Sequence, residues 1–233
     1  PRSSSLGDPT IPYNQLLRAY PQYTSLSMYR NNTGTTNYQG FSAKLEQRLS
    51  RGLSYLVSYT RSSLKDDASS VFDASILTGP VANYPVADSF DWSRERDYST
   101  GDIPHVFAVS VVWLIPLGRG QAYSPGGILG AIVSDWSLAG ALSMQSGVPI
   151  AVSQATNNNV FAGFGVQRPN LNGDPELPGD EQSENRWFNT SVFSTAPQFT
   201  LGSGPRNPVR GPSYRNLDLA LSRRVAMSAA SMV

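Results

Sequence analysis

Several stretches of this chain alternate between apolar and polar side chains, and the segments that link them are either very short or very long. Successive side chains of a β-strand point to opposite faces, so this alternation predicts strands that separate two environments. A water-soluble sandwich usually has turn signals at regular intervals. Unequal links, rich in Gly, Asn, Pro and Ser where they are long, are instead typical of a transmembrane β-barrel.

The alternation defines the strands that we expect. The predicted strands are 39–49, 53–62, 106–115, 136–145 and 216–224. In the first of them, Phe41 and Leu45 fall on the face opposite Lys44 and Glu46. The third is apolar on both faces, so its sidedness is weaker. A soluble sheet packed on a core would show the same pattern, and periodicity alone therefore leaves both architectures open.

Composition narrows the class of protein. Hydrophobic residues make up 39% of the 233 residues, and no apolar run approaches the roughly 20 residues of a spanning helix. A β-barrel does not need such a run, because only alternate residues face lipid. Cysteine is absent, which excludes disulfides and thiolate metal sites. The net charge of +1 gives no reason to expect a nucleic-acid partner.

The links between the predicted strands fall into two groups. A tight turn at 50–52 and a Gly-rich connection at 116–131 lie on one side, where we expect a strand to begin at 132 and run to 147. Long polar segments at 64–103 and 154–212 lie on the other side. Connections of that length are usually functional or disordered. The chain starts at Pro1 without an initiator Met or a signal peptide, so we expect it to be a piece of a longer protein.

Three amphipathic aromatic residues flank the shorter links. Tyr55 follows the first link, and Trp113 and Trp136 stand on either side of the second. Aromatic residues gather at both interfaces of a membrane-spanning barrel, so these three are predicted to form an interfacial girdle. The alternative interpretation is that they are ordinary sheet aromatics that shield the rim of a protein core.

The residue types that carry catalysis or bind metals form no convincing pattern. His105 is the single histidine, which leaves no histidine cluster for a metal and no second histidine for a catalytic triad. The acidic residues of 174–184 lack the spacing of a calcium-binding loop. We therefore predict no enzymatic activity, no cofactor and no metal.

The chain resembles the barrel of large TonB-dependent-receptor-like proteins of the Oar-like group, which carry a carboxypeptidase-regulatory-like domain and are abundant in Acidobacteria. The resemblance covers most of 20–225, in the family's order. No single matching segment is specific to this group, but the whole set of segments is. The matching segments are 38–55, 57–60, 105–120, 135–149, Arg168-Pro169-Asn170, Gly173-Asp174-Pro175, Arg186-Trp187-Phe188-Asn189 and 204–212.

The resemblance implies a fold and a location. The implied fold is an all-β, antiparallel transmembrane β-barrel with long loops. The implied location of the protein is the outer membrane of a Gram-negative-type bacterium. Residues 1–233 would form part of one barrel domain, without the plug domain and the closing strands that such proteins carry. The expected partners are the lipid bilayer, an unidentified small ligand, and a TonB-type energising protein that acts through parts outside this chain. We expect a monomer.

Two groups of residues are candidates for function in such a barrel. Lys44, Glu46 and Arg48 share one strand face, which the resemblance implies is the lumen, where they would line a passage or contact a plug. Aromatic and Asn residues of the long loops are candidate ligand contacts because of their position alone. They are Trp92, Asn157, Asn158, Asn159, Phe161 and Phe164.

Two other functions remain open at this stage. A secreted soluble β-sandwich that binds carbohydrate would place Trp113 and Trp136 in its core and use the loop aromatics as a platform. An adhesive or structural surface barrel would keep the membrane location but transport nothing. In a soluble sheet Lys44, Glu46 and Arg48 would simply be a solvated face.

Overall fold

The computed structural model describes residues 5–7, 9–23, 34–67, 87–88, 91–118, 123, 125–155 and 167–224. The elements are η1 (Ser5–Gly7), α1 (Tyr13–Leu16), β1 (Thr36–Ser50), β2 (Leu53–Asp66), η2 (Trp92–Glu95), β3 (Asp97–Tyr98), β4 (His105–Leu114), α3 (Gly127–Val133), β5 (Trp136–Gln145), β6 (Pro149–Ile150), β7 (Asn170–Leu171), η3 (Thr190–Val192), β8 (Phe193–Ser194), β9 (Val209–Arg210) and β10 (Tyr214–Arg223).

Contacts divide the chain into two compact units. The sheet unit consists of 39–62, 103–147 and 212–233, and the loop unit consists of 1–38, 63–102 and 148–211. None of the helices in the described ranges combines the length and the apolarity of a bilayer-spanning helix.

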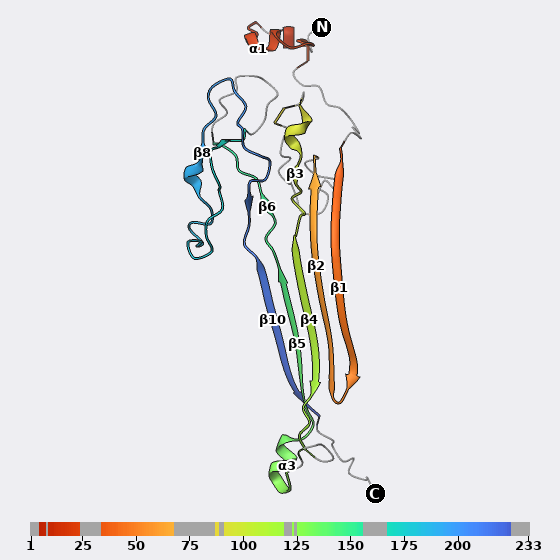
Figure 1. Cartoon of the computed structure of the whole chain (residues 1–233). Helices are drawn as coiled ribbons and strands as arrows, with labels where there is room; N and C mark the ends of the chain where they lie inside the picture. Colours follow the sequence, from red (N-terminus) through yellow and green to blue (C-terminus); the bar gives the residue numbers. More distant parts are fainter. Residues whose placement is uncertain are drawn as a thin grey trace. The chain divides into compact units, whose positions relative to one another are not determined.

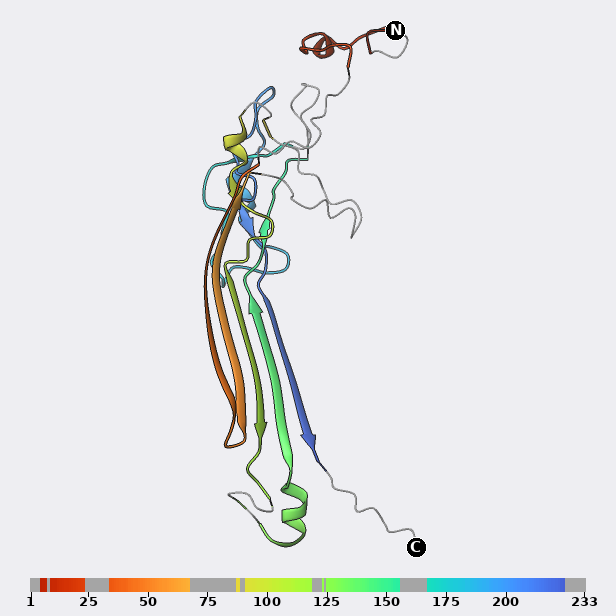
Figure 2. The same cartoon turned by 90° about the vertical axis from the view of Figure 1, so that its right-hand side faces the viewer.

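Five long strands form one sheet in the order β1-β2-β4-β5-β10, and β3 adds a short pairing to β2 (Figure 1). β2 pairs with β3 and β4, β4 with β5, and β5 with β10, all in antiparallel orientation. The five strands predicted from the alternating pattern are confirmed, with ends that shift by a few residues. Figure 2 shows the same strands from the side, with the long pair β1 and β2 bowed along its length. The all-β antiparallel fold is thus observed, as an open sheet with β1 and β10 at its edges.

The pairing register gathers the apolar side chains of β2, β4, β5 and β10 on one face. Residues directly opposite each other in an antiparallel pair point to the same side. One such row runs Val57, Val109, Leu142, Leu217 across the four strands. The parallel rows are Leu53, Trp113, Leu138, Leu221 and Tyr55, Val111, Gly140, Leu219. Gly140 leaves room in its row, because a Cβ there would lie 3.1 Å from a methyl of Leu219.

The opposite face of the sheet is mainly small and polar. It pairs Ser110 with Ala141, and Ala141 with Asp218. β1 follows the same division, because the hydroxyls of Ser42 and Thr60 lie 3.0 Å apart and so place these two residues on this polar face.

The described residues contain almost no buried apolar core. The buried hydrophobic residues are Leu177, Ala196 and Val209, and none of them belongs to a long strand. In contrast, Phe41 is 65% exposed and Leu219 is 66% exposed. A soluble sandwich would bury these side chains between two sheets, so the structure contradicts the sandwich alternative. An uncovered apolar face flanked by a polar one is the arrangement of a barrel wall in lipid.

The connections differ between the two ends of the sheet. β1 and β2 are joined by a tight turn in which Arg51 and Gly52 have φ of 51° and 81°. This left-handed backbone suits a two-residue hairpin turn, and Gly52 adopts it without strain. β4 and β5 are joined at the same end by the segment that contains α3. The long segments 67–104 and 146–213 join strands at the other end.

One part of the sequence-based prediction was wrong. We expected a strand from 132, but residues up to Val133 belong to α3, and β5 begins at Trp136. The run Gly127–Val133 is short and apolar, and such a run fits a buried strand and a helix equally well. Asp135, with φ of 62°, ends the connection and reorients the chain into β5.

Two neighbouring substitutions in β5 test which face meets lipid. Leu142→Arg should sharply reduce assembly, because a cation at the lipid face near the bilayer midplane costs about 2–4 kcal/mol. Ala141→Arg should be tolerated, since it lies on the polar face in register with Asp218. The measurement is the amount of heat-modifiable folded protein in the membrane fraction. Greater damage from Ala141→Arg than from Leu142→Arg would show that the apolar face points inward.

Candidate functional site

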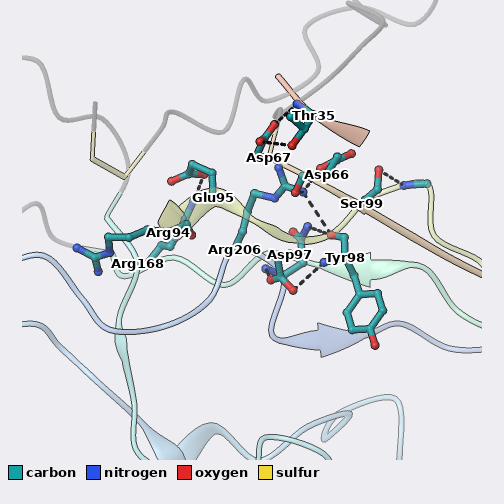
Figure 3. Close-up of polar contacts among 12 residues, drawn as sticks. Thr35, Asp66, Asp67, Arg94, Glu95, Asp97, Tyr98, Ser99, Arg168 and Arg206 are labelled. Atoms are coloured by element: carbon teal, nitrogen blue, oxygen red, sulfur yellow. Dashed lines mark hydrogen bonds and ion pairs between the residues drawn. The ribbon is translucent and has the colours of Figure 1, made fainter. Parts of the chain in front are cut away.

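Three ion pairs between arginines and carboxylates connect distant segments inside the loop unit. Each joins an arginine of the segment 167–211 to an acidic residue at the end of β2 or in the segment 91–102. The pairs are Glu95–Arg168, Asp66–Arg206 and Asp102–Arg210. Figure 3 shows the surroundings of the first two. The long connections are therefore held together as a structured surface.

The Asp102–Arg210 pair is built around a carboxylate that is 0% exposed. One oxygen of Asp102 lies 2.5 Å from Nη2 of Arg210, and the other accepts a hydrogen bond of 2.6 Å from the backbone N–H of Leu64. The Arg210 guanidinium also lies over the ring of Tyr98, 5.0 Å from its centroid. Charge-assisted hydrogen bonds of this kind satisfy a buried charge and fix its geometry.

The Asp66–Arg206 pair fastens the segment 167–211 to the last residue of β2. Both side chains are buried, and Nη2 of Arg206 donates to Oδ1 of Asp66. The next residue, Asn207, extends the contact to β3. Its backbone N–H donates to Oδ2 of Asp97 and its Nδ2 donates to the carbonyl of Tyr98, each at a distance of 2.8 Å. Asn207 thus contacts both residues of β3, Asp97 and Tyr98, which lie near Arg206 in Figure 3.

The Glu95–Arg168 pair anchors η2. Glu95 accepts from Nη2 of Arg168 at 2.5 Å and from the backbone N–H of Ala87 at 2.9 Å. Its neighbour Arg94 donates to the carbonyl of Gly202 at 2.5 Å. Gly202 must be a glycine, because a Cβ there would lie 1.9 Å from the carbonyl oxygen of Arg168. The close packing of the two segments depends on this absent side chain.

Side-chain caps set the local shape of the loop unit. Asp91 precedes η2 and accepts hydrogen bonds from the N–H and the hydroxyl of Ser93. These two bonds, the side-chain one first, lower the pKa of Asp91. Asn189 caps η3 in the same way through Ser191. Asx-type caps of this kind satisfy backbone donors where a short helix begins.

Asp67 fixes the chain that leads into β1. Its two carboxylate oxygens accept from the backbone N–H and the hydroxyl of Thr35, each at 2.5 Å. Partial burial raises the pKa of Asp67, but the hydrogen bonds from Thr35 and a more distant Arg96 outweigh this, so its pKa lies below the usual 3.8. Asp67 stands just beyond the end of β2.

The predicted ligand contacts are only partly described by the structure. Trp92 begins η2 and is half-buried, two residues before Arg94 in the anchored segment. The other five predicted contacts lie outside the described residues. They are Asn157, Asn158, Asn159, Phe161 and Phe164. Ligand binding by all six stays a prediction.

The charged residues of β1 form a ladder along one face. Glu46 lies 2.9 Å from Nζ of Lys44 and 3.8 Å from Nε of Arg48, and all three side chains are exposed. Because side chains alternate along a strand, these three residues lie on the same face as Ser42. The contact of Ser42 with Thr60 places that face on the polar side of the sheet. This position fits the lumen assignment, which stays a prediction.

The three predicted girdle aromatics share the apolar face. Trp113 is in register with Leu53 and Leu138, and Tyr55 and Trp136 each lie one row away from it. The indole N–H of Trp136 donates to the carbonyl of Ile132 in α3 at 2.8 Å. All three therefore lie near the end of the sheet with the shorter connections. Their role at the membrane interface stays a prediction.

Sequence reasoning missed the three ion pairs. It treated 64–103 and 154–212 as polar loops and did not connect their charges. The sequence did contain one indication of these pairs. Each of the three arginines stands next to proline, asparagine or glycine, in segments that contain few other basic residues. The segments are Arg168-Pro169-Asn170, Pro205-Arg206-Asn207-Pro208 and Arg210-Gly211-Pro212. The described residues contain no group of three metal-ligating side chains.

Comparisons with known proteins give one finding about the family. A family model described as an outer membrane beta barrel domain matches residues 4–232. No curated protein and no solved structure matches the chain. The matched range includes both the sheet unit and the loop unit.

Breaking one buried ion pair should loosen the loop unit. Asp66→Asn leaves Arg206 buried without its carboxylate, which costs about 3–5 kcal/mol. Amide hydrogen exchange in 167–211 should rise strongly. The exposed pair of Glu46 provides the control, because Glu46→Gln should change stability by less than about 1 kcal/mol. The double variant Asp66→Leu/Arg206→Met should regain most of the protection, and a double variant as labile as Asp66→Asn would contradict this explanation.

The hydrogen bonds of Asp67 should depend on pH. Because its pKa in the folded protein lies below 3.8, the stabilisation is complete above that value and is lost as the pH falls through the folded pKa. Exchange at the amide of Thr35 should therefore accelerate, relative to other amides, only at acidic pH. In Asp67→Asn this acid-dependent step should disappear. An unchanged step in the variant would assign it to another group.

Proposed function

Because the chain belongs to the family of outer membrane β-barrel domains, we propose that it is the ligand-binding barrel part of a TonB-dependent-receptor-like transporter of the Oar-like type. The protein is located in the bacterial outer membrane. The resemblance of 38–55, 105–120 and 135–149 to that group supports the finer assignment. Short turns of such barrels face the periplasm and long loops face the exterior.

The observation that carries this proposal is the anchored loop unit. A barrel that served only as a wall would not need long connections tied by three ion pairs with buried carboxylates. Desolvating these carboxylates and their arginines is costly, and pairs of this kind give little net stability compared with apolar packing. Their benefit is a defined geometry, and a preformed surface binds a ligand with a smaller loss of conformational entropy.

The proposed mechanism has three steps. The loop unit captures a small ligand at the cell surface, with Trp92 and the predicted contacts at 157–164 as candidate ligand-binding residues. The ligand then passes along the polar face of the barrel wall, where Lys44, Glu46 and Arg48 offer alternating charges. A plug domain gates this passage, and a TonB-type protein supplies the energy. The mechanism contains no covalent chemistry, cofactor or metal.

The alternative within the same family is an adhesive barrel that binds but does not transport. It would use the same anchored loop unit. The charged ladder on the polar face favours transport, because a barrel without a passage has no need for exchangeable ion pairs on its inner surface. Uptake that requires the energising protein distinguishes the two functions.

A matched pair of aromatic substitutions tests the proposal. Trp92→Ala should weaken capture of the ligand, because the variant loses the indole ring and with it stacking and apolar contact with the ligand. Phe199→Ala, which removes an exposed aromatic side chain elsewhere in the loop unit, should leave capture unchanged. The measurement is uptake by cells of labelled ferric siderophores, oligosaccharides and peptides, with and without the TonB-type protein. Uptake of the same ligand without that protein would contradict energised transport.

A further inference from the structure

The apolar face of the sheet changes character at the end with the long connections. The row beyond Val57 runs Tyr59, Phe107, Met144, Arg215 across four strands. The next row pairs Arg61 with His105. Two arginines and a histidine therefore follow a wall of aliphatic residues on the same face. An arginine on a lipid-facing strand surface is costly unless it lies at the membrane interface and finds a polar partner there.

Arg61 and Arg215 differ from the other arginines that organise this protein. Arg168, Arg206 and Arg210 each hold a buried carboxylate. In the described part of the chain no acidic group lies within ion-pair distance of Arg61 or Arg215, and both are exposed. Their two charges are available to an anion from outside the protein.

An apolar hollow lies on the strands between Arg61 and Arg215. Arg215 lines it, and Arg61 is in register with His105, which also lines it. The hollow has a volume of about 220 Å³ and is bordered by His105, Phe107, Met144, Ser146, Ser213 and Arg215, together with Gln145 and Tyr214. Because side chains alternate along each strand, the first six of these residues lie on the apolar face. The ring of His105 is fixed, because one of its nitrogens lies 2.8 Å from the hydroxyl of Tyr59 and the two rings stack. The hollow thus combines an apolar floor with polar and cationic edges.

The spacing of the cations suits a large headgroup. Arg61 is on β2 and Arg215 is on β10, three strands away in the sheet order. Their Cα atoms are therefore separated by about 14 Å across the strands and about 7 Å along them. Arginine side chains extend along apolar surface toward the interface, and the guanidinium binds phosphate in a bidentate way. One ligand that carries more than one phosphate could engage both.

We infer that this surface, Arg61 and Arg215 with the hollow between them, is a binding site for a phosphorylated, acylated lipid of the outer leaflet. The headgroup phosphates bind the two arginines, and one acyl chain lies on Phe107 and Met144. The surface is continuous with the lipid-facing wall of the barrel. It lies at the end of the sheet with the long connections, which face the cell exterior in outer-membrane barrels. Such a lipid would fix the depth of the barrel in the membrane.

Binding of a defined lipid to the full-length protein tests the inference. The probes are phosphatidylcholine nanodiscs with lipid A, nanodiscs with dephosphorylated lipid A, and inorganic phosphate alone. Native mass spectrometry and thermal shifts report retention of the lipid. The parent protein should retain lipid A and bind the dephosphorylated form at least about tenfold more weakly, which corresponds to about 1.4 kcal/mol. Inorganic phosphate should not displace the lipid.

Three variants complete the experiment. Arg61→Gln/Arg215→Gln should reduce retention of lipid A at least about tenfold. Arg61→Lys/Arg215→Lys should lose less than this, because lysine supplies the charge but not the bidentate guanidinium. Arg186→Gln, which removes an exposed arginine of the loop unit, should behave as the parent does. Equal retention of the phosphorylated and dephosphorylated lipids by the parent would overturn the site, even if a variant failed to fold. Displacement by inorganic phosphate would reduce it to a simple anion site.

Discussion

A strand that crosses hydrocarbon has no water to satisfy its backbone N–H and C=O groups, so each must be paired with a neighbouring strand. In this protein the ladder of the sheet gives β2, β4 and β5 a paired strand on both sides, and β1 and β10 a paired strand on one side. Because the side-chain period is two, the same ladder also decides which residues face lipid. A slip of one residue between β5 and β10 would move Leu217 and Leu219 to the polar face and Asp218 to the apolar one. Register and membrane compatibility are therefore one constraint.

The ladder also determines where function can be placed. Antiparallel strands return the chain alternately to each end of the sheet, which separates the shorter connections from the long ones. The long connections carry most of the buried charge of the described residues. In the described part of the loop unit the buried hydrophobic residues are only Leu177, Ala196 and Val209, so ion pairs there take the place of an apolar core. A polar, rigid surface held by charges suits recognition of a ligand better than an apolar core would.

Much of the sheet could be predicted from particular residues. The alternation of Phe41 and Leu45 with Lys44 and Glu46 predicted β1, and the turn at Arg51-Gly52 predicted its hairpin with β2. The helix α3 could not be predicted, because seven apolar or small residues have no clear period. The ion pair of Asp102 with Arg210 could not be predicted either. The two residues are far apart in the sequence, and charge alone does not show which partners meet.

The sequence by itself determined the strands, their two faces and the difference between short and long connections, because these depend on local period and on turn residues. Only the tertiary structure decided how the rows of side chains align across strands. It placed Arg61 and Arg215 on the apolar face of the sheet and brought Asp66, Glu95 and Asp102 to their arginines. The physical reason is that alignment and ion pairing arise between segments distant in the chain, where register and chain closure select the neighbours.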